Sequence, residues 1–175
     1  MLALAPAPVK LPDIEGLMVA HGDSLLRLCT LYLKDYQLAE DAVQETFIRA
    51  YTKYHTFRGQ SSEKTWLTRI AINICKDTMR RRAFSERPGD DVLPDRPDPG
   101  AGPEDAAIER ERDRRLLGAV QGLEPIYQEV VLLFYYSGLK VSEIAAALNT
   151  REGTVKTRLM RARTRLGEIL EEDML

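Results

Sequence analysis

The highest density of positive charge in the chain lies in residues 151–166, which read REGTVKTRLMRARTRL. This stretch holds six basic residues against a single acid, Glu152. The basic residues are Arg151, Lys156, Arg158, Arg161, Arg163 and Arg165. Such side chains bind phosphate and donate hydrogen bonds to base edges, so the cluster indicates a nucleic-acid partner. The other interpretation is a solvated helix face with no partner.

Outside this cluster the chain is not basic. Its 25 Lys and Arg residues against 27 Asp and Glu residues give a net charge of −2. A content of 44% hydrophobic and 30% charged residues is typical of a soluble globular protein. No apolar run reaches the roughly 18 residues that span a bilayer, so no membrane insertion is expected. Prolines interrupt the opening MLALAPAPVKLP, which predicts a frayed N-terminus rather than a signal peptide.

No residues of the chain form a pattern typical of catalysis. His21 and His55 have no spaced carboxylate or cysteine partners, and no glycine-rich phosphate loop is present. Cys29 and Cys75 lie far apart among apolar residues, which predicts buried thiols in a reducing cytoplasm. We therefore expect neither an enzyme nor a protein that needs a metal or another cofactor.

A proline-rich acidic segment divides the chain into two parts. Residues 87–105, RPGDDVLPDRPDPGAGPED, contain five of the nine prolines and six acids against two arginines. Too few apolar side chains are present there to offset the chain entropy lost on folding, which predicts a flexible linker. The predicted domains are residues 13–86 and residues 106–175, both small and all-α.

The first domain is predicted to contain three helices, because its apolar residues recur three or four positions apart. The apolar positions of the first two helices are Ile14, Leu17, Met18, Leu25, Leu28, Cys29 and Tyr32, then Ala39, Val43, Phe47, Ala50 and Tyr54. A third helix is expected from Glu63 to Arg82, after a break at HTFRGQSS. Its predicted apolar face is Trp66, Leu67, Ile70, Ile74 and Met79.

The basic cluster lies on the second helix of a predicted helix-turn-helix. A short helix at residues 141–148, a polar turn at residues 149–151 and a longer helix follow one another. The buried stripe expected on the longer helix is Val155, Leu159, Ala162, Leu166 and Ile169. The opposite face of such a helix enters the major groove of DNA.

The outward-facing residues of this helix divide into two predicted roles. Base-edge contacts are predicted for Lys156 and Arg161, with Thr157 and Met160 beside them. Phosphate contacts, which give affinity without sequence information, are predicted for Arg151, Arg158, Arg163 and Arg165.

Two motifs resemble one known family. LAEDAVQETFIRAYTKYHTFRG followed by TWLTRIAINICKDTMRRR resembles domain 2 of the bacterial sigma-70 family, in its extracytoplasmic-function (ECF) group, and GTVKTRLMRARTRL resembles domain 4. The resemblance covers about residues 14–171 apart from the linker. It implies a sigma factor that binds core RNA polymerase, recognises the −35 promoter element through domain 4 and melts the −10 element through domain 2.

The resemblance assigns a partner to the second helix. Its face opposite the core consists of Glu40, Asp41, Gln44, Glu45 and Ile48. In the family this face docks on the clamp helices of the polymerase β′ subunit, and the β subunit is a further expected partner. A solvated acidic face is the alternative.

The stretch HTFRGQSSEKTWLTRIAIN matches the part of the family that reads the −10 element. The resemblance implies that Phe57 stacks on or wedges between bases, although packing in the small core is the alternative. Asn73 matches a position lining the pocket for a flipped base, and Trp66 is expected to be structural. The side chains expected to hold the DNA backbone are Arg58, Lys64, Arg69 and Lys76.

The family also suggests how the protein is regulated. Its linker threads through the polymerase cleft and competes with nascent RNA, although residues 87–105 can equally be a tether between the domains. Small sigma factors without domain 3 or a large acidic N-terminal region are typically controlled by an anti-sigma factor. Tyr135 and Tyr136 are expected in the core, with an inhibitor surface as the alternative.

Two other kinds of protein fit part of the sequence. A helix-turn-helix regulator that binds duplex DNA alone could use the first domain for dimerisation, but has no need of AEDAVQETF or TWLTRIAIN. An antagonist that occupies the sigma site on polymerase would keep the acidic face but lose the basic helix. This chain has both.

Overall fold

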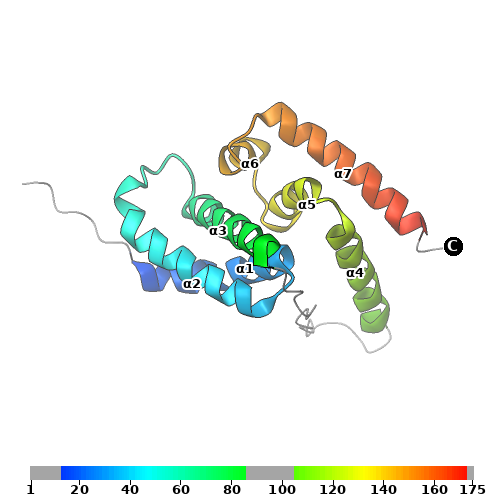
Figure 1. The fold of residues 1–175 in the computed structure, drawn as a ribbon, viewed down its shortest axis with the longest axis horizontal. Helices are drawn as coiled ribbons and strands as arrows, with labels where there is room; N and C mark the ends of the chain where they lie inside the picture. Colours follow the sequence, from blue (N-terminus) through cyan, green and yellow to red (C-terminus); the bar gives the residue numbers. More distant parts are fainter. Residues whose placement is uncertain (1–12, 86–104, 173–175) are drawn as a thin grey trace, which may run out of the picture.

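The computed structural model describes residues 13–85 and 105–172, and all the regular elements in these ranges are helices (Figure 1). The prediction of an all-α fold is therefore confirmed. The predicted linker lies outside the described residues, except for Asp105, which begins a helix. Within the described ranges, no helix has the length and apolar character needed to cross a membrane.

The N-terminal lobe, residues 13–85, consists of α1 (Ile14–Leu33), α2 (Tyr36–Lys53), a 3-10 turn (Tyr54–Thr56) and α3 (Glu63–Ser85). Asp13 caps α1 by accepting a hydrogen bond from the Gly16 N–H at 2.9 Å. Asp35 caps α2 in the same way, at 3.0 Å from the Leu38 N–H. The two aspartates thus satisfy N–H groups that have no partner inside a helix.

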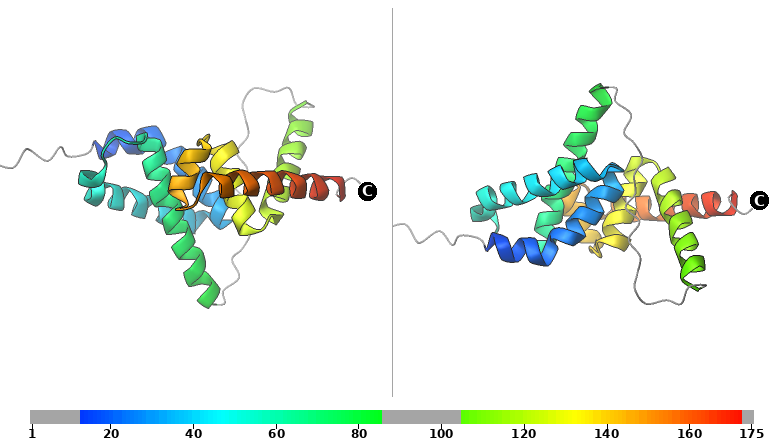
Figure 2. Two further views of the ribbon diagram at one scale, coloured as in Figure 1. Left: turned by 90° about the horizontal axis from the view of Figure 1, so that it is seen from above. Right: turned by 90° about the horizontal axis from the view of Figure 1, so that it is seen from below.

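Two methionines predicted in the core of the N-terminal lobe are exposed. Met18 follows Leu17, which faces the core, and neighbouring residues in a helix point about 100° apart. Met79 lies on the C-terminal turns of α3, which project beyond the rest of the lobe (Figure 2). Both predictions were wrong because periodicity does not show how far a helix is covered.

The C-terminal lobe, residues 105–172, contains α4 (Asp105–Gly122), α5 (Pro125–Val131), a π-helical turn (Leu132–Tyr136), α6 (Val141–Ala147) and α7 (Glu152–Glu172). Pro125 occupies the first turn of α5, where its missing N–H costs little. The predicted helix-turn-helix is present as α6 and α7. Its turn includes Asn149 in the left-handed region, with a φ of 50°.

The π-helical turn accounts for the exposure of two aromatic side chains. Tyr135 and Tyr136 are 57% and 43% exposed, so their predicted place in the core is wrong. Leu132 and Leu133, at the start of the same turn, are buried. The π-helical turn thus presents its two leucines to the core and its two tyrosines to solvent.

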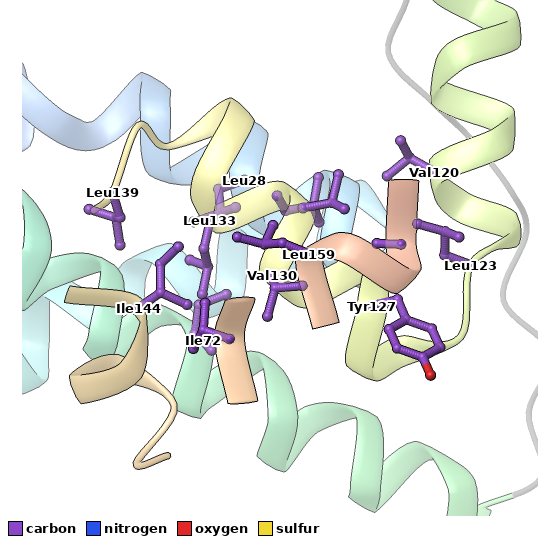
Figure 3. Close-up of a cluster of buried hydrophobic side chains, with 14 of the residues drawn as sticks. Leu28, Ile72, Val120, Leu123, Tyr127, Val130, Leu133, Leu139, Ile144 and Leu159 are labelled. Atoms are coloured by element: carbon purple, nitrogen blue, oxygen red, sulfur yellow. The ribbon is translucent and has the colours of Figure 1, made fainter. Parts of the chain in front are cut away.

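The two lobes pack against each other. Leu28 of α1 and Ile72 of α3 are fully buried in the same cluster as Val130, Leu133 and Ile144 of the C-terminal lobe (Figure 3). Figure 1 shows α5 and α6 between the N-terminal lobe and α7. Periodicity placed Leu28 in a core, but did not show that this core belongs to both lobes.

Candidate nucleic-acid interface

Helix α7 presents the basic face predicted from the sequence. Its other face packs on the C-terminal lobe through Val155, Leu159 and Ala162, all buried. The predicted base-edge residues Lys156, Thr157, Met160 and Arg161 are exposed. Met160 is 61% exposed, which leaves an apolar side chain among polar ones on an open surface.

The turn before α7 fixes the direction of this helix. The Thr150 N–H donates to the Ala145 carbonyl at 2.9 Å, which closes the end of α6. The Lys140 N–H donates to a Glu143 carboxylate oxygen at 2.8 Å, which caps the start of α6. These bonds fix the two ends of α6, and α7 packs on α6, so the exposed face of α7 is presented on an ordered support.

Two of the arginines predicted to hold phosphate already have partners within the lobe. Arg163 Nε donates to the Tyr135 hydroxyl at 2.8 Å, and Arg165 lies 3.5 Å from a Glu124 carboxylate oxygen. These contacts are exposed and so contribute little to stability. They leave the other guanidinium nitrogens of each arginine available. Arg151 is exposed, and Arg158 is half-buried beside the turn.

The acidic face of α2 is accessible on the N-terminal lobe. Asp41, Gln44 and Ile48 are exposed, whereas Glu40 and Glu45 are half-buried. Glu45 is paired with Arg49 of the same helix at 2.7 Å. The face therefore offers an apolar side chain flanked by polar groups, which is typical of a protein-binding surface.

An aromatic cluster joins the loop that precedes α3 to the first turn of that helix. The ring centroid of Phe57 lies 5.1 Å from that of Trp66 and 5.8 Å from that of Tyr54. The Tyr54 hydroxyl donates to Glu63 at 3.3 Å, which ties the loop to the start of α3. Phe57 is half-buried, which is compatible with both alternatives from the sequence: stacking on DNA bases and packing in the small core.

The candidate −10 residues do not lie on a single face. Arg69 and Asn73 are exposed neighbours on α3, and Arg58 is exposed in the loop. Lys64 is also exposed, but it precedes Asn73 by nine positions, which is about two and a half turns of helix. The two side chains therefore lie on opposite sides of α3. Lys76 is half-buried, and its Nζ lies 2.6 Å from a Glu129 carboxylate oxygen of the other lobe.

Comparison with known proteins places both lobes in one family. Residues 17–84 match the Sigma-70 region 2 family, and residues 113–166 match Sigma-70, region 4. The ECF RNA polymerase sigma factor SigW of Bacillus subtilis is 34% identical, over 87% of this chain and 86% of the relative. SigX of the same organism is 32% identical, over 89% and 83%. The chain is an ECF sigma factor of the sigma-70 family.

Two solved structures have a similar fold. The sigma factor RpoE in complex with the anti-sigma factor NepR, from Bartonella quintana, is 26% identical, with a TM-score of 0.73 over 91% of this chain and 97% of that one. CnrH in complex with the cytosolic domain of CnrY has a TM-score of 0.67 at 24% identity, over 91% and 88%. The first likeness extends over both lobes of the present sigma factor.

Sequence reasoning missed the polar contacts between the lobes of this sigma factor. Thr65 donates to Glu143 at 2.7 Å, and the Tyr32 hydroxyl lies 3.4 Å from the Glu129 carboxylate that holds Lys76. One signal was present in the sequence, because Glu129 is an acid within the apolar run YQEVVLLFYY. A buried acid needs a partner, but its position in the sequence does not identify that partner.

Proposed function

We propose that this sigma factor directs core RNA polymerase to a set of promoters, with the helix-turn-helix reading the −35 element and the N-terminal lobe opening the −10 element. The observation that carries the proposal is the exposed face of α7. Lys156, Thr157, Met160 and Arg161 lie on it, and its buried face anchors it to α5 and α6. A major groove admits a helix presented in this way.

In this proposal the two lobes have separate tasks. Residues 13–86 bind polymerase and the −10 element, residues 106–175 bind the −35 element, and residues 87–105 connect them. Asp41, Gln44 and Ile48 of α2, with Glu40 and Glu45, contact the β′ clamp helices, and the C-terminal lobe contacts the β subunit. Arg58, Arg69 and Asn73 support the proposed −10 contact, because all three are exposed and Arg69 and Asn73 lie one turn apart on α3.

The proposal makes the protein an initiation factor that acts in the cytoplasm, while polymerase supplies the catalysis. An anti-sigma factor is the proposed regulator, since the similar sigma factor RpoE was solved in complex with the anti-sigma factor NepR. Tyr135 and Tyr136 are a candidate surface for it, because both are exposed aromatic side chains.

Run-off transcription tests the proposed function. Core bacterial polymerase is assayed with and without the protein, on a promoter library at fixed salt, because affinity for DNA depends strongly on salt. Transcripts that need the protein and share −35 and −10 sequences are expected. DNA binding by the protein alone, with no transcripts, would instead support a stand-alone helix-turn-helix regulator.

A further inference from the structure

The Tyr135 hydroxyl connects the π-helical turn after α5 to the basic helix α7. It accepts a hydrogen bond from Arg163 Nε at 2.8 Å. The two residues are 28 positions apart in the chain, and the packing of α5 on α7 brings them together. A solvent-exposed hydrogen bond of this kind adds little to stability, so stability alone does not account for it.

The π-helical turn directs Tyr135 toward α7. Val131 and Tyr135 lie four positions apart, so they would share one face of an α-helix. Val131 is nevertheless buried, whereas Tyr135 is exposed. The difference comes from the wider turn, in which the Ser137 N–H donates to the Leu132 carbonyl, five residues earlier, at 2.9 Å. π-helical turns of this kind often occur at functional sites.

The ring of Tyr135 is supported by its neighbour Phe134. Phe134 is half-buried and packs against the shared apolar cluster. Its ring meets the Tyr135 ring edge to face, with the centroids 5.0 Å apart and an interplanar angle of 81°. Aromatic pairs favour this geometry. The hydroxyl that Arg163 contacts therefore belongs to a side chain that is itself held in place.

The hydrogen bond leaves the phosphate-binding part of Arg163 available. Nε provides only one of the N–H donors of a guanidinium group. The donors on the two Nη atoms form the fork that binds two oxygens of one phosphate. A neutral hydroxyl also leaves the positive charge in place, unlike the Glu124 carboxylate that lies 3.5 Å from Arg165. Arg163 is thus oriented without losing its charge or its fork.

Arg163 lies on the flank of the exposed face of α7. It follows the buried Ala162 by one position, which is about 100° around the helix. Thr157 follows the buried Val155 by two positions, about 200°, and so points away from the lobe. When a helix enters the major groove, the side chains at its centre reach base edges and those on its flanks reach phosphates. The position of Arg163 therefore suits a phosphate contact.

We propose that Tyr135 is a positioning residue for the −35 contact, because its hydroxyl fixes the Arg163 guanidinium with the Nη fork directed at a phosphate. The conformational entropy of this long side chain is then lost when the protein folds rather than when DNA binds, which makes DNA binding tighter. This inference rests on the proposed function for the identity of the ligand. The hydrogen bond itself does not depend on it.

Binding of −35 duplexes to the full chain, measured by fluorescence anisotropy at fixed salt, tests this role. Tyr135→Phe removes the hydroxyl and keeps the ring. This variant should bind every duplex about twofold to tenfold more weakly, which is the cost of ordering one long side chain. Its base preference should not change, because a phosphate contact carries no sequence information. Tyr51→Phe, the same change at an exposed tyrosine of α2, is the control and should bind like the wild type. Equal affinities of the two variants would overturn the inference.

A double-mutant cycle shows whether Tyr135 acts through Arg163. In the Arg163→Ala background, Tyr135→Phe should cause no further loss of affinity, because the guanidinium that the hydroxyl orients is absent. A loss of the same size in both backgrounds would mean that Tyr135 acts on DNA independently of Arg163, which would contradict the positioning role.

Duplexes with one neutral methylphosphonate in place of a phosphate provide a second readout. The phosphate that Arg163 contacts is the one whose neutralisation weakens binding of the wild type but not of Arg163→Ala. At that position the loss should be smaller for Tyr135→Phe than for the wild type. An equal loss in both proteins, or no position that distinguishes the wild type from Arg163→Ala, would overturn the inference.

Urea denaturation and helical circular dichroism should be the same for Tyr135→Phe and the wild type, because the lost bond is exposed. If Tyr135→Phe loses helical structure, Arg163→Lys decides instead, since it keeps the positive charge but lacks the Nε donor and the fork. This variant should also bind every duplex more weakly than the wild type. Unchanged affinity in Arg163→Lys would show that charge alone is sufficient and would overturn the inference.

The outcomes separate this inference from the proposed function. Protein-dependent transcripts from the wild type, with equal duplex binding by the wild type and Tyr135→Phe, would overturn the positioning role alone. Weaker duplex binding by Tyr135→Phe, without transcripts from any protein, would support the positioning of Arg163 and overturn the role in initiation.

Discussion

At the scale of single residues, the arginines of α7 differ in the contacts that their side chains make within the lobe. Arg163 is held by the Tyr135 hydroxyl through Nε, and Arg165 is near Glu124. Arg161 is exposed on the side that also carries Thr157, one turn earlier. These surroundings suit Arg163 to a fixed phosphate contact and Arg161 to a base edge.

The first prediction concerns these two arginines. Arg161→Ala should weaken binding to the preferred −35 duplex by about 1–3 kcal/mol and relax base preference there, whereas Arg163→Ala should weaken all duplexes evenly. Binding is measured by fluorescence anisotropy on the preferred sequence and on single-base variants of it. A uniform loss in both variants would contradict the assignment of roles.

At the scale of elements, α2 and α7 each bury one face in the core, and the proposed function assigns the other face to a partner. On α2 the outward face includes Asp41 and Gln44, three positions apart and both exposed. Residues at this spacing lie side by side on a helix, so they can act on a partner together.

The second prediction removes both side chains. Asp41→Ala with Gln44→Ala should abolish binding to core polymerase while duplex DNA binding by the full chain is retained, because α7 is untouched. A pull-down with core polymerase measures the first and anisotropy the second. Asp23→Ala with Ser24→Ala, an exposed pair on α1, is the control and should bind polymerase normally. Unchanged polymerase binding by the α2 variant would refute the assignment.

The third prediction concerns the stability of the helix-turn-helix. Ile144 of α6 is completely buried, so Ile144→Ala should lower the free energy of unfolding by about 2–5 kcal/mol. Met160→Ala, on the exposed face of α7, should change it by no more than about 0.5 kcal/mol. Urea denaturation measures both. Equal stabilities would mean that Ile144 does not lie in the core.

At the scale of the whole molecule, the lobes share one apolar cluster and a set of polar contacts. Leu28 and Ile72 contribute to the cluster from the N-terminal lobe. Glu143 belongs to both the α6 cap and the lobe contact. The Lys140 N–H and the Thr65 hydroxyl donate to its carboxylate and hold the pKa of Glu143 below its ordinary value of 4.5.

The fourth prediction follows from this depressed pKa. The carboxylate contributes stability that is fully present above pH 4.5 and is lost as the pH falls through the lower pKa of the folded state. The difference in the free energy of unfolding between the wild type and Glu143→Gln should therefore decrease as the pH falls through this range. Urea denaturation at several pH values checks it, with Glu168→Gln as the control for the loss of one carboxylate. A difference that does not change with pH would contradict the prediction.

Much of the molecule could be predicted from the sequence, for physical reasons that differ between elements. The stripe Val155, Leu159 and Ala162 predicted the orientation of α7, because a helix buries residues three and four apart. The same rule failed for Met18 and Met79, since it does not show how much of a helix its neighbours cover. It also failed for Tyr135 and Tyr136, because a π-helical turn changes which side chains face inward.

The amino-acid sequence by itself determined the helices, the helix-turn-helix and the family, because these depend on local spacing and on motifs that are continuous in the chain. Only the tertiary structure decided that Lys76 lies against Glu129 and Thr65 against Glu143. These partners belong to different lobes, so their pairing depends on how α3 packs on α6. No local pattern encodes such packing, since it is set by the summed burial of surfaces from both lobes.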